Sequence, residues 1–157
     1  MEKKWLTALG QMICGIYVLT TRFEDTINGM IASWVTQISH DPPLIVVAIH
    51  PNRYSHALID SSGVFALHVI HRSQKELLKR FKGPDPLKKF DGISWKYGKT
   101  GVPIIDACIA SFELEVKEQH PLGNHTLFVG EVVSCRFQSP GTPLSTLDYE
   151  GMYVGKD

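Results

Sequence analysis

Residues 28–43, NGMIASWVTQISHDPP, constrain the fold of this chain more than any other stretch. Small and hydroxyl residues alternate with apolar ones, and a period of two places them on opposite faces of a strand. Two consecutive prolines close the stretch, and proline cannot donate a hydrogen bond to a sheet ladder. We therefore predict one strand, with an apolar face and a face of short hydrogen-bonding groups, that ends at Pro42-Pro43.

The rest of the chain shows further strand and helix patterns. Asn28-Gly29 predicts that residues 22–28 reverse the chain before the opening strand. The apolar run of residues 44–49 predicts a strand buried on both faces. Ser73-Gln74-Lys75-Glu76 has the pattern of a capping box and predicts a helix start. The other expected elements are strands over residues 13–21, 64–70, 109–116 and 126–137, helices over 2–12 and 53–62, and an irregular segment over 83–103.

About six strands with short helices predict a mainly β protein built as a small antiparallel barrel. At 157 residues, the chain has the length of one domain, which we expect to span residues 1–157. Strands and helices do not alternate regularly and no Gly-x-Gly-x-x-Gly occurs, which argues against a Rossmann domain. The absence of Gly-x-x-x-x-Gly-Lys-Ser/Thr argues against a nucleoside triphosphatase.

Charge and cysteine usage exclude several classes of partner. Lys plus Arg and Asp plus Glu each number 16, and a formal net charge of zero argues against nucleic-acid or membrane-surface binding. No segment approaches the roughly 20 apolar residues that span a bilayer. Cys14, Cys108 and Cys135 are far apart, which favours a reduced protein in the cytoplasm over a disulfide framework.

Seven histidines raise the question of a metal site. His68 and His71 would point to opposite faces of a strand, and no His-Glu-x-x-His is present. We therefore expect no bound metal. His125 follows a Gly-Asn turn, where it could border a cofactor or shuttle a proton, although a structural hydrogen bond is the commoner role for such a histidine.

Two segments are candidates for cofactor binding. Residues 52–56, NRYSH, join an apolar strand to a helix N-terminus, where backbone N–H groups, Arg53 and Ser55 would attract an anion. The alternative is a solvated turn with a helix cap. In the opening stretch, Ala32, Ser33 and Thr36 are small enough to let a planar ring approach the backbone, but an ordinary half-buried strand would show the same pattern.

The ordered set of motifs resembles the flavin reductase-like family. Residues 28–39 and the Asp41-Pro42-Pro43-Leu44-Ile45 segment are similar to that family's Met-Thr-Ala-Ser and Asp-Pro-Pro-Leu pattern. Residues 62–67, SGVFAL, follow in the family's order. Residues 123–132, GNHTLFVGEV, resemble its Gly-Asp-His-x-Leu-Phe-x-Gly-Glu-Val.

This resemblance implies the FMN-binding split barrel, of Greek-key type, with FMN as a more probable cofactor than FAD. It also implies a homodimer with NAD(P)H as co-substrate, and it makes His125 the candidate catalytic residue, beside the nicotinamide or substrate. The flavin ring and ribityl chain would lie against Met30, Ile31, Ala32, Ser33, Trp34, Val35 and Thr36, with Gln37 and Ser39 nearby. The phosphate would lie near Asn52, Arg53 and Ser55, with Arg80 as a further candidate.

Three departures from the family pattern bear on the activity. Ile31 replaces a threonine, Asn124 replaces an aspartate, and Trp34 resembles short members that transfer electrons, including those fused to rubredoxin. The leading hypothesis is an FMN-dependent oxidoreductase that passes electrons from NAD(P)H to a flavin, protein or metal acceptor. The alternatives are a non-enzymatic FMN carrier reduced by a redox partner such as a rubredoxin-type protein, and a barrel that has lost flavin and binds a partner.

Overall fold

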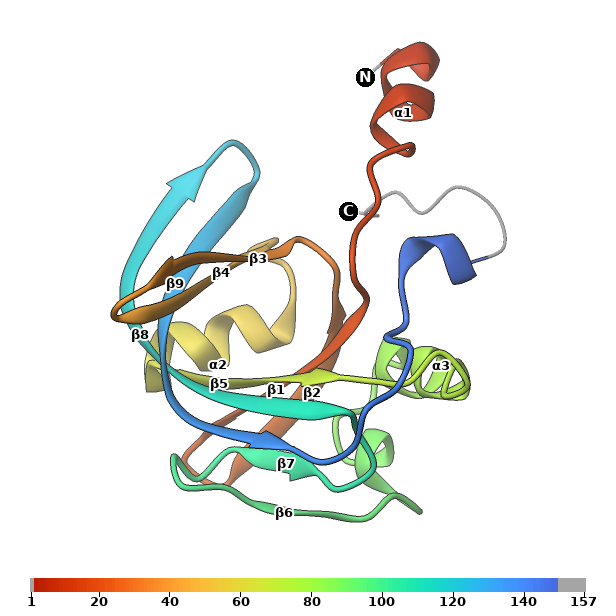
Figure 1. Cartoon of the computed structure of the whole chain (residues 1–157). Coiled ribbons are helices and arrows are strands. Elements are labelled where there is room, and N and C mark those ends of the chain that lie inside the picture. Colours follow the sequence, from red (N-terminus) through yellow and green to blue (C-terminus); the bar gives the residue numbers. More distant parts are fainter. Residues whose placement is uncertain (1, 150–157) are drawn as a thin grey trace.

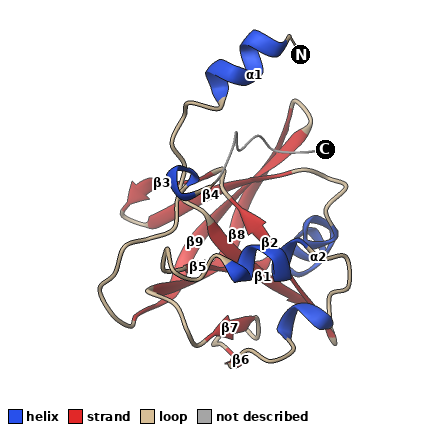
Figure 2. Cartoon of the chain, turned by 90° about the vertical axis from the view of Figure 1, so that its right-hand side faces the viewer, coloured by secondary structure: helices blue, strands red, loops and turns tan. Residues whose placement is uncertain are grey.

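The computed structural model describes residues 2–149 (Figures 1 and 2). Strands dominate and the helices are short, so the predicted mainly β class is confirmed. The elements are α1 (Lys3–Leu9), β1 (Tyr17–Phe23), β2 (Thr26–Ala32), β3 (Val35–His40), β4 (Pro43–Ile49), α2 (Tyr54–Ser62), β5 (Val64–Val69), α3 (Glu76–Lys82), the 3-10 helix η1 (Lys88–Phe90), β6 (Trp95–Tyr97), β7 (Pro103–Ile105), β8 (Ala110–Leu122), β9 (His125–Phe137) and the 3-10 helix η2 (Thr146–Asp148).

Seven strands form one sheet in the order β2-β1-β5-β8-β9-β4-β3, and β6 pairs with β7 separately. In Figure 1 the large sheet curls, so that β3 and β4 lie across from β1 and β5. The two edge strands, β2 and β3, are not paired with each other. The sheet is therefore an unclosed barrel, as the predicted split barrel requires.

The opening stretch is two strands, so the prediction of a single strand was wrong. β2 ends at Ala32 and β3 begins at Val35, and the two lie at opposite edges of the sheet. Ser33 and Trp34 carry the chain from one edge to the other. Small and polar residues alternate with apolar ones on both sides of this break in the sequence, so the pattern alone does not reveal the change of partner.

The predicted chain reversal within residues 22–28 is confirmed, but Asn28-Gly29 does not form the turn. The chain reverses between β1 and β2 at Glu24, whose φ is 52°, and Asn28 and Gly29 pair with β1 inside β2. A Cβ on Gly29 would lie 2.5 Å from Cε1 of Phe81, which packs over this strand from α3. Gly29 therefore serves close packing rather than a turn.

β4 was predicted to be buried on both faces, and this is also wrong. Ile45, Val47 and Ile49 are buried, whereas the residues between them are half-buried. β1 and β5 are the strands with four consecutive buried residues, and in β1 Leu19 faces the barrel interior while Val18 faces α3. Thr20 and Thr21 in β1 are also fully buried. Because threonine carries a hydroxyl group, the hydropathy pattern did not indicate this burial.

Two large apolar clusters stabilise the described part of the chain, beside a small one of Ala66, Val102 and Ile104. The first fills the barrel, where Ile59 of α2 packs with side chains from β1, β4, β5, β8 and β9. The second lies outside β1 and β2, where Leu77, Leu78 and Phe81 of α3 pack with Phe90 of η1. α2 ends at Gly63 as predicted, with φ of 70°. Within residues 2–149, no helix is long and apolar enough to cross a membrane.

The predicted capping box at residues 73–76 does not form. α3 begins at Glu76 after Lys75, which makes no side-chain cap. Instead, Gln74 accepts a hydrogen bond from the backbone N–H of His71 and donates one to the carbonyl of Ala107. These contacts attach the segment before α3 to the loop after β7.

Candidate functional site

A pocket of about 770 Å³ opens at one end of the barrel. β3 and the start of β4 form one wall, and β1, β5, β8 and β9 form the other. No Lys, Arg, Asp or Glu contributes to either wall. The lining residues are Tyr17, Val35, Thr36, Gln37, Ser39, His40, Pro43, Leu44, Ile45, Leu67, Val69, Phe112, Val132, Val133, Ser134 and Cys135.

Four of the residues predicted to contact the flavin line this pocket. They are Val35, Thr36, Gln37 and Ser39, all from β3. The register of β3 against β4 shifts between Gln37 and Ser39, which bends the strand at the pocket wall. The wall thus offers hydroxyl and amide groups beside aliphatic side chains, a mixture that suits a planar heterocycle.

The other residues predicted for the ring lie outside the pocket. Met30, Ile31 and Ala32 belong to β2, at the opposite edge of the sheet, and Ala32 is buried in the barrel core. Ser33 and Trp34 lie in the crossing between the two edges. The structure therefore divides the predicted ring-binding stretch between two edges of the sheet.

The predicted phosphate segment lies at the N-terminus of α2. Asn52 and Arg53 are exposed, and Arg53 is the N-cap residue without a side-chain cap. A helix N-terminus with no capping side chain favours an anion. Ser55 is different, because it is fully buried and its Oγ accepts a hydrogen bond from Nδ2 of Asn28 at 2.9 Å. Direct contact between Ser55 and a ligand does not fit this burial.

A chain of buried hydrogen bonds attaches α2 to β2 and η1. Nζ of Lys89 donates to Oδ1 of Asn28 at 3.0 Å and to the carbonyl oxygen of Gly29 at 2.8 Å. Lys89 is only 7% exposed, and burial lowers the pKa of its ammonium group. Asn28 connects this lysine to Ser55, so the chain links η1, β2 and α2. Sequence reasoning missed it, since Lys89 lies in the segment predicted to be irregular.

Arg80 lies apart from both predicted groups. It lines a separate hollow of about 460 Å³ beside α3 and η1, with Lys79, Lys88 and Lys89 among the neighbours. Its guanidinium donates to the backbone carbonyls of Lys88 and Asp91. These contacts hold the loop after α3.

His125 begins β9 and belongs to an aromatic cluster. Its ring centroid is 4.7 Å from that of Trp34, and His50 meets it edge-on at 5.3 Å. Nδ1 of His125 lies 2.7 Å from Oδ1 of Asn124, and Nδ1 of His50 accepts from the backbone N–H of Asn52. The structure thus brings together three residues predicted separately, Trp34, Asn52 and His125, and adds His50.

His68 and His71 were predicted on opposite faces of one strand, but β5 ends at Val69 and His71 lies beyond it. His68 is fully buried, and its Nδ1 lies 3.0 Å from the carbonyl oxygen of Val18 while its Nε2 accepts from the N–H of Ile105. Burial lowers the pKa of His68 to about 4. His68 is therefore a neutral core residue that attaches β7 to the sheet. Across residues 2–149, no three His, Cys, Asp or Glu side chains are grouped to hold a metal.

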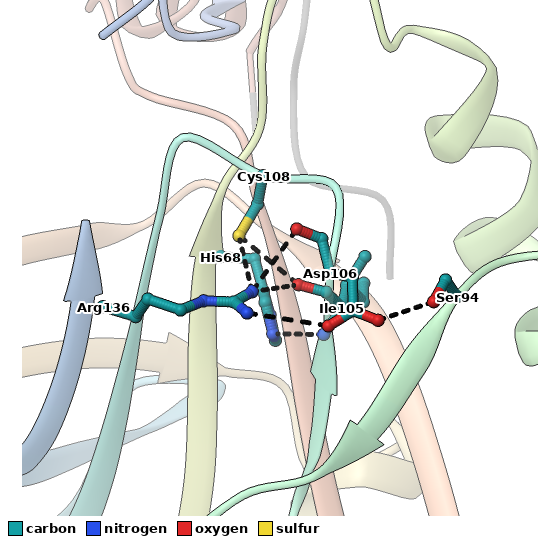
Figure 3. A network of polar contacts seen from close by, with 6 residues as sticks. All are labelled: His68, Ser94, Ile105, Asp106, Cys108 and Arg136. Carbon is teal, nitrogen blue, oxygen red and sulfur yellow. Dashed lines mark hydrogen bonds and ion pairs between the residues drawn. The ribbon is translucent and has the colours of Figure 1, made fainter. Parts of the chain in front are cut away.

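Arg136 makes a second attachment near His68 (Figure 3). Its Nη2 donates to the carbonyls of Ile105 and Asp106, and its Nη1 pairs with the Asp106 carboxylate at 3.6 Å. The hydroxyl of Ser94 donates to the same carboxylate, and this hydrogen bond is the largest influence that lowers the pKa of Asp106. The partners are mainly backbone groups, so this network positions the loop after β7.

Sequence reasoning missed most of the pocket wall. Tyr17, Phe112 and Cys135 reach it from β1, β8 and β9, and more than a hundred residues of chain separate Tyr17 from Cys135. Each looks like an ordinary strand residue in the sequence. No local motif would have found them.

Comparisons with known proteins agree with this geometry. The model of the flavin reductase like domain matches residues 9–156. The ferric-chelate reductase (NAD(P)H) of Archaeoglobus fulgidus is 33% identical over 146 residues, which cover 90% of this chain and 86% of the relative. The high molecular weight rubredoxin of Moorella thermoacetica is 30% identical over 152 residues, covering 94% of this chain and 66% of the relative.

Solved structures share the fold as well. Nitrilotriacetate monooxygenase component B from Mycobacterium thermoresistibile superposes with a TM-score of 0.84 at 29% identity, covering 91% of this chain and 80% of that one. The likeness extends over nearly the whole described chain and includes the unclosed barrel that forms the pocket.

Proposed function

The chain belongs to the flavin reductase-like family, and we propose that it is an FMN-binding oxidoreductase that passes electrons from NAD(P)H to a flavin, protein or metal acceptor. The observation that carries this proposal is the uncharged pocket of about 770 Å³ in the barrel mouth. Its size is within the range of cofactor sites, and barrel mouths are common places for them. A neutral, planar ring fits such a wall, whereas a phosphate does not.

The phosphate would lie outside the ring pocket, at the N-terminus of α2. Arg53 supplies a cation there and Asn52 an amide, and the helix dipole favours the same charge. Because Ser55 is buried, we assign it no direct contact with the phosphate. It instead holds Asn28, and through Asn28 the buried Lys89, beneath the helix.

The flavin would supply the hydride chemistry, and the protein would bind and orient it. Thr36, Gln37 and Ser39 present hydrogen-bonding groups to the ring edge, while Leu44, Leu67 and Phe112 exclude water from its faces. His125 lies beyond this wall, next to Trp34, where it would border the nicotinamide. No acid or base is needed inside the pocket for hydride transfer.

Neighbouring positions on β3 allow a matched test of the ring pocket. Ser39→Trp should lower the affinity for FMN at least about tenfold, because the indole would fill space that the ring needs. Ile38→Trp is the control, since Ile38 does not line the pocket and is 49% exposed. Titration of the purified protein followed by flavin fluorescence measures both. Equal affinities for the two variants would contradict this placement of the ring.

The phosphate site has its own test. Arg53→Ala should weaken FMN binding by about 10- to 100-fold, because a charge-assisted hydrogen bond is lost. Riboflavin lacks the phosphate, so its affinity should be the same for Arg53→Ala as for the unaltered protein. If both ligands weaken equally, the phosphate does not lie at Arg53. Wild-type protein that is colourless and takes up neither ligand would contradict the FMN proposal altogether.

A second candidate function is a non-enzymatic electron carrier, in which a redox protein reduces the bound FMN. The likeness to a high molecular weight rubredoxin, and the Trp34 departure, favour it. Stopped-flow mixing with NADH and then NADPH separates the two functions. Rapid bleaching of the flavin by either donor supports the reductase, and failure with both supports the carrier.

We also propose a cytoplasmic homodimer that retains FMN rather than FAD. Leu122 at the tip of the β8–β9 hairpin and Phe137 at its base are 67% and 71% exposed, and a second copy would cover such side chains. The cysteines at positions 14, 108 and 135 are all free, which suits a reducing compartment. Sedimentation velocity and chromatography of the released flavin test these points.

A further inference from the structure

Trp34 occupies an unusual place in the fold. It lies between the two edge strands, and its carbonyl oxygen accepts a hydrogen bond from the N–H of Ala48 at 3.0 Å. This bond anchors the crossing to β4. The side chain is nevertheless 50% exposed, although Ala32 before the crossing and Val35 after it both pack in the barrel core. The fold therefore holds the backbone of Trp34 in place and leaves much of its indole at the surface.

The exposed indole is supported from one side by histidine rings. The His125 ring is tilted by 43° to the indole at a centroid distance of 4.7 Å, and His50 meets His125 at 88°. Nδ1 of His125 must donate to Oδ1 of Asn124, because an amide oxygen only accepts. This hydrogen bond fixes the orientation of the imidazole, which in turn limits the rotation of the indole.

The cluster of Trp34, His50 and His125 lies next to both parts of the proposed cofactor site. Val35, the next residue along the chain, lines the ring pocket. On the other side, His50 accepts a hydrogen bond from Asn52 at the α2 N-terminus. The cluster thus connects the two segments to which we assign the flavin ring and its phosphate. Its own side chains are aromatic or neutral amides, which suit a planar, carboxamide-bearing ring.

We propose that Trp34 stacks on the nicotinamide ring of the reductant and that His125 and Asn124 are positioning residues for this stack. The inference rests on the proposed function, which supplies the dinucleotide. Indole has the strongest attraction for a cation among aromatic side chains, so the oxidised, positively charged nicotinamide should bind the indole better than the reduced one. Trp34 thereby sets the affinity for the donor and the rate at which its product leaves.

The first test uses flavin-free protein, so it does not depend on FMN binding. Oxidised nicotinamide mononucleotide should quench part of the tryptophan fluorescence, and Trp34→Phe should abolish that quenching. Trp5→Phe is the matched control, since Trp5 is 56% exposed and lies on α1, with no aromatic ring among its contacts in residues 2–149. ADP-ribose, which lacks the nicotinamide ring, is the control ligand. Quenching by ADP-ribose and not by the mononucleotide would overturn the assignment to nicotinamide.

The second test uses flavin-loaded protein and stopped-flow reduction. Trp34→Ala should raise the dissociation constant for NADH about 3- to 10-fold, the range expected for one lost aromatic stack. Product inhibition by NAD+ should fall by a larger factor, and Trp34→Phe should restore part of the NADH affinity. FMN affinity should stay within twofold of wild type, because Trp34 does not line the ring pocket.

The two proposals fail in different ways. Wild-type protein that binds no flavin contradicts the proposed function. If wild type binds FMN and is reduced by NADH, but Trp34→Ala has unchanged constants for NADH and NAD+, the role of Trp34 is wrong and the reductase function stands. Loss of FMN affinity in Trp34→Ala, with the donor constants unchanged, would also overturn it and would place the indole at the flavin instead.

Discussion

Lys89→Met should lower the free energy of unfolding by about 2–4 kcal/mol, the cost of leaving two buried acceptors without a donor. Those acceptors are Oδ1 of Asn28 and the carbonyl oxygen of Gly29. The methionine chain would fill the space of the lysine stem, so the cavity contribution is small. The loss is partly offset because the ammonium group no longer has to be buried.

Urea denaturation followed by circular dichroism measures this loss, and Lys88 provides the control. Lys88 is the preceding residue of η1, its side chain is 80% exposed and its ion pair with Asp85 spans 3.7 Å. Lys88→Met should change the unfolding free energy by less than about 1 kcal/mol. A loss for Lys89→Met no greater than that of Lys88→Met would contradict the buried chain.

A double-mutant cycle tests whether Lys89 and Asn28 act together. Asn28→Ala removes the acceptor of Lys89 and the donor to Ser55. The two single substitutions should therefore lower the free energy of unfolding by amounts whose sum exceeds the loss in the double variant, with a coupling of about 1–2 kcal/mol. Additive losses would show that the two groups do not share one network.

His68→Leu should destabilise the protein at pH 7 and much less at pH 4. At neutral pH the substitution removes the acceptor of the Ile105 N–H and the partner of the Val18 carbonyl, both buried, at a cost of about 2–4 kcal/mol. The folded protein keeps His68 neutral, with its pKa lowered to about 4 from the ordinary value of 6.5, chiefly by burial.

The sign of the pH effect follows from this lowered pKa. Above pH 6.5, the contribution of His68 to stability is fully present. As the pH falls from 6.5 to 4, the unfolded chain takes up a proton that the folded chain does not, so the wild type loses about 3 kcal/mol that the variant does not lose. Below pH 4 both states are protonated, and the difference becomes constant.

Measuring unfolding free energies of both proteins at several pH values isolates this effect. Arg136 and Glu113 have smaller and opposite influences on the pKa of His68, and both residues remain in the variant. His120→Gln is the control, because His120 is exposed and pairs with Glu118 on the surface. A constant difference between wild type and His68→Leu from pH 7 to 4 would show that His68 is not held neutral.

Local patterns were sufficient for most of the elements. Strand-forming residues and, in β8, alternation predicted β1, β5, β8 and β9, although β1 begins later than predicted and β8 extends further. The Gly63 terminus of α2 was also predictable, since only a left-handed residue ends the helix there. These features depend on residues within a few positions of one another.

The errors share one cause, which is that a pattern of burial does not identify the partner. Gly29 looked like a turn residue, but the ring of Phe81, more than fifty residues away, requires it. The sequence did not show the break at Ser33-Trp34, because small and polar residues alternate with apolar ones on both sides of it. Lys89 lay in a segment predicted to be irregular, and nothing local indicated that it would donate to Asn28.

By itself, the sequence determined that this chain has a mainly β fold and belongs to the flavin reductase-like family, since strand patterns and the ordered motifs are local properties. Only the tertiary structure decided that residues 28–43 supply opposite edges of an unclosed sheet, that the pocket has no charged wall, and that Trp34 meets His125. Each of these depends on which strands pair across the chain, and pairing is set by the packing of the whole barrel rather than by any one segment.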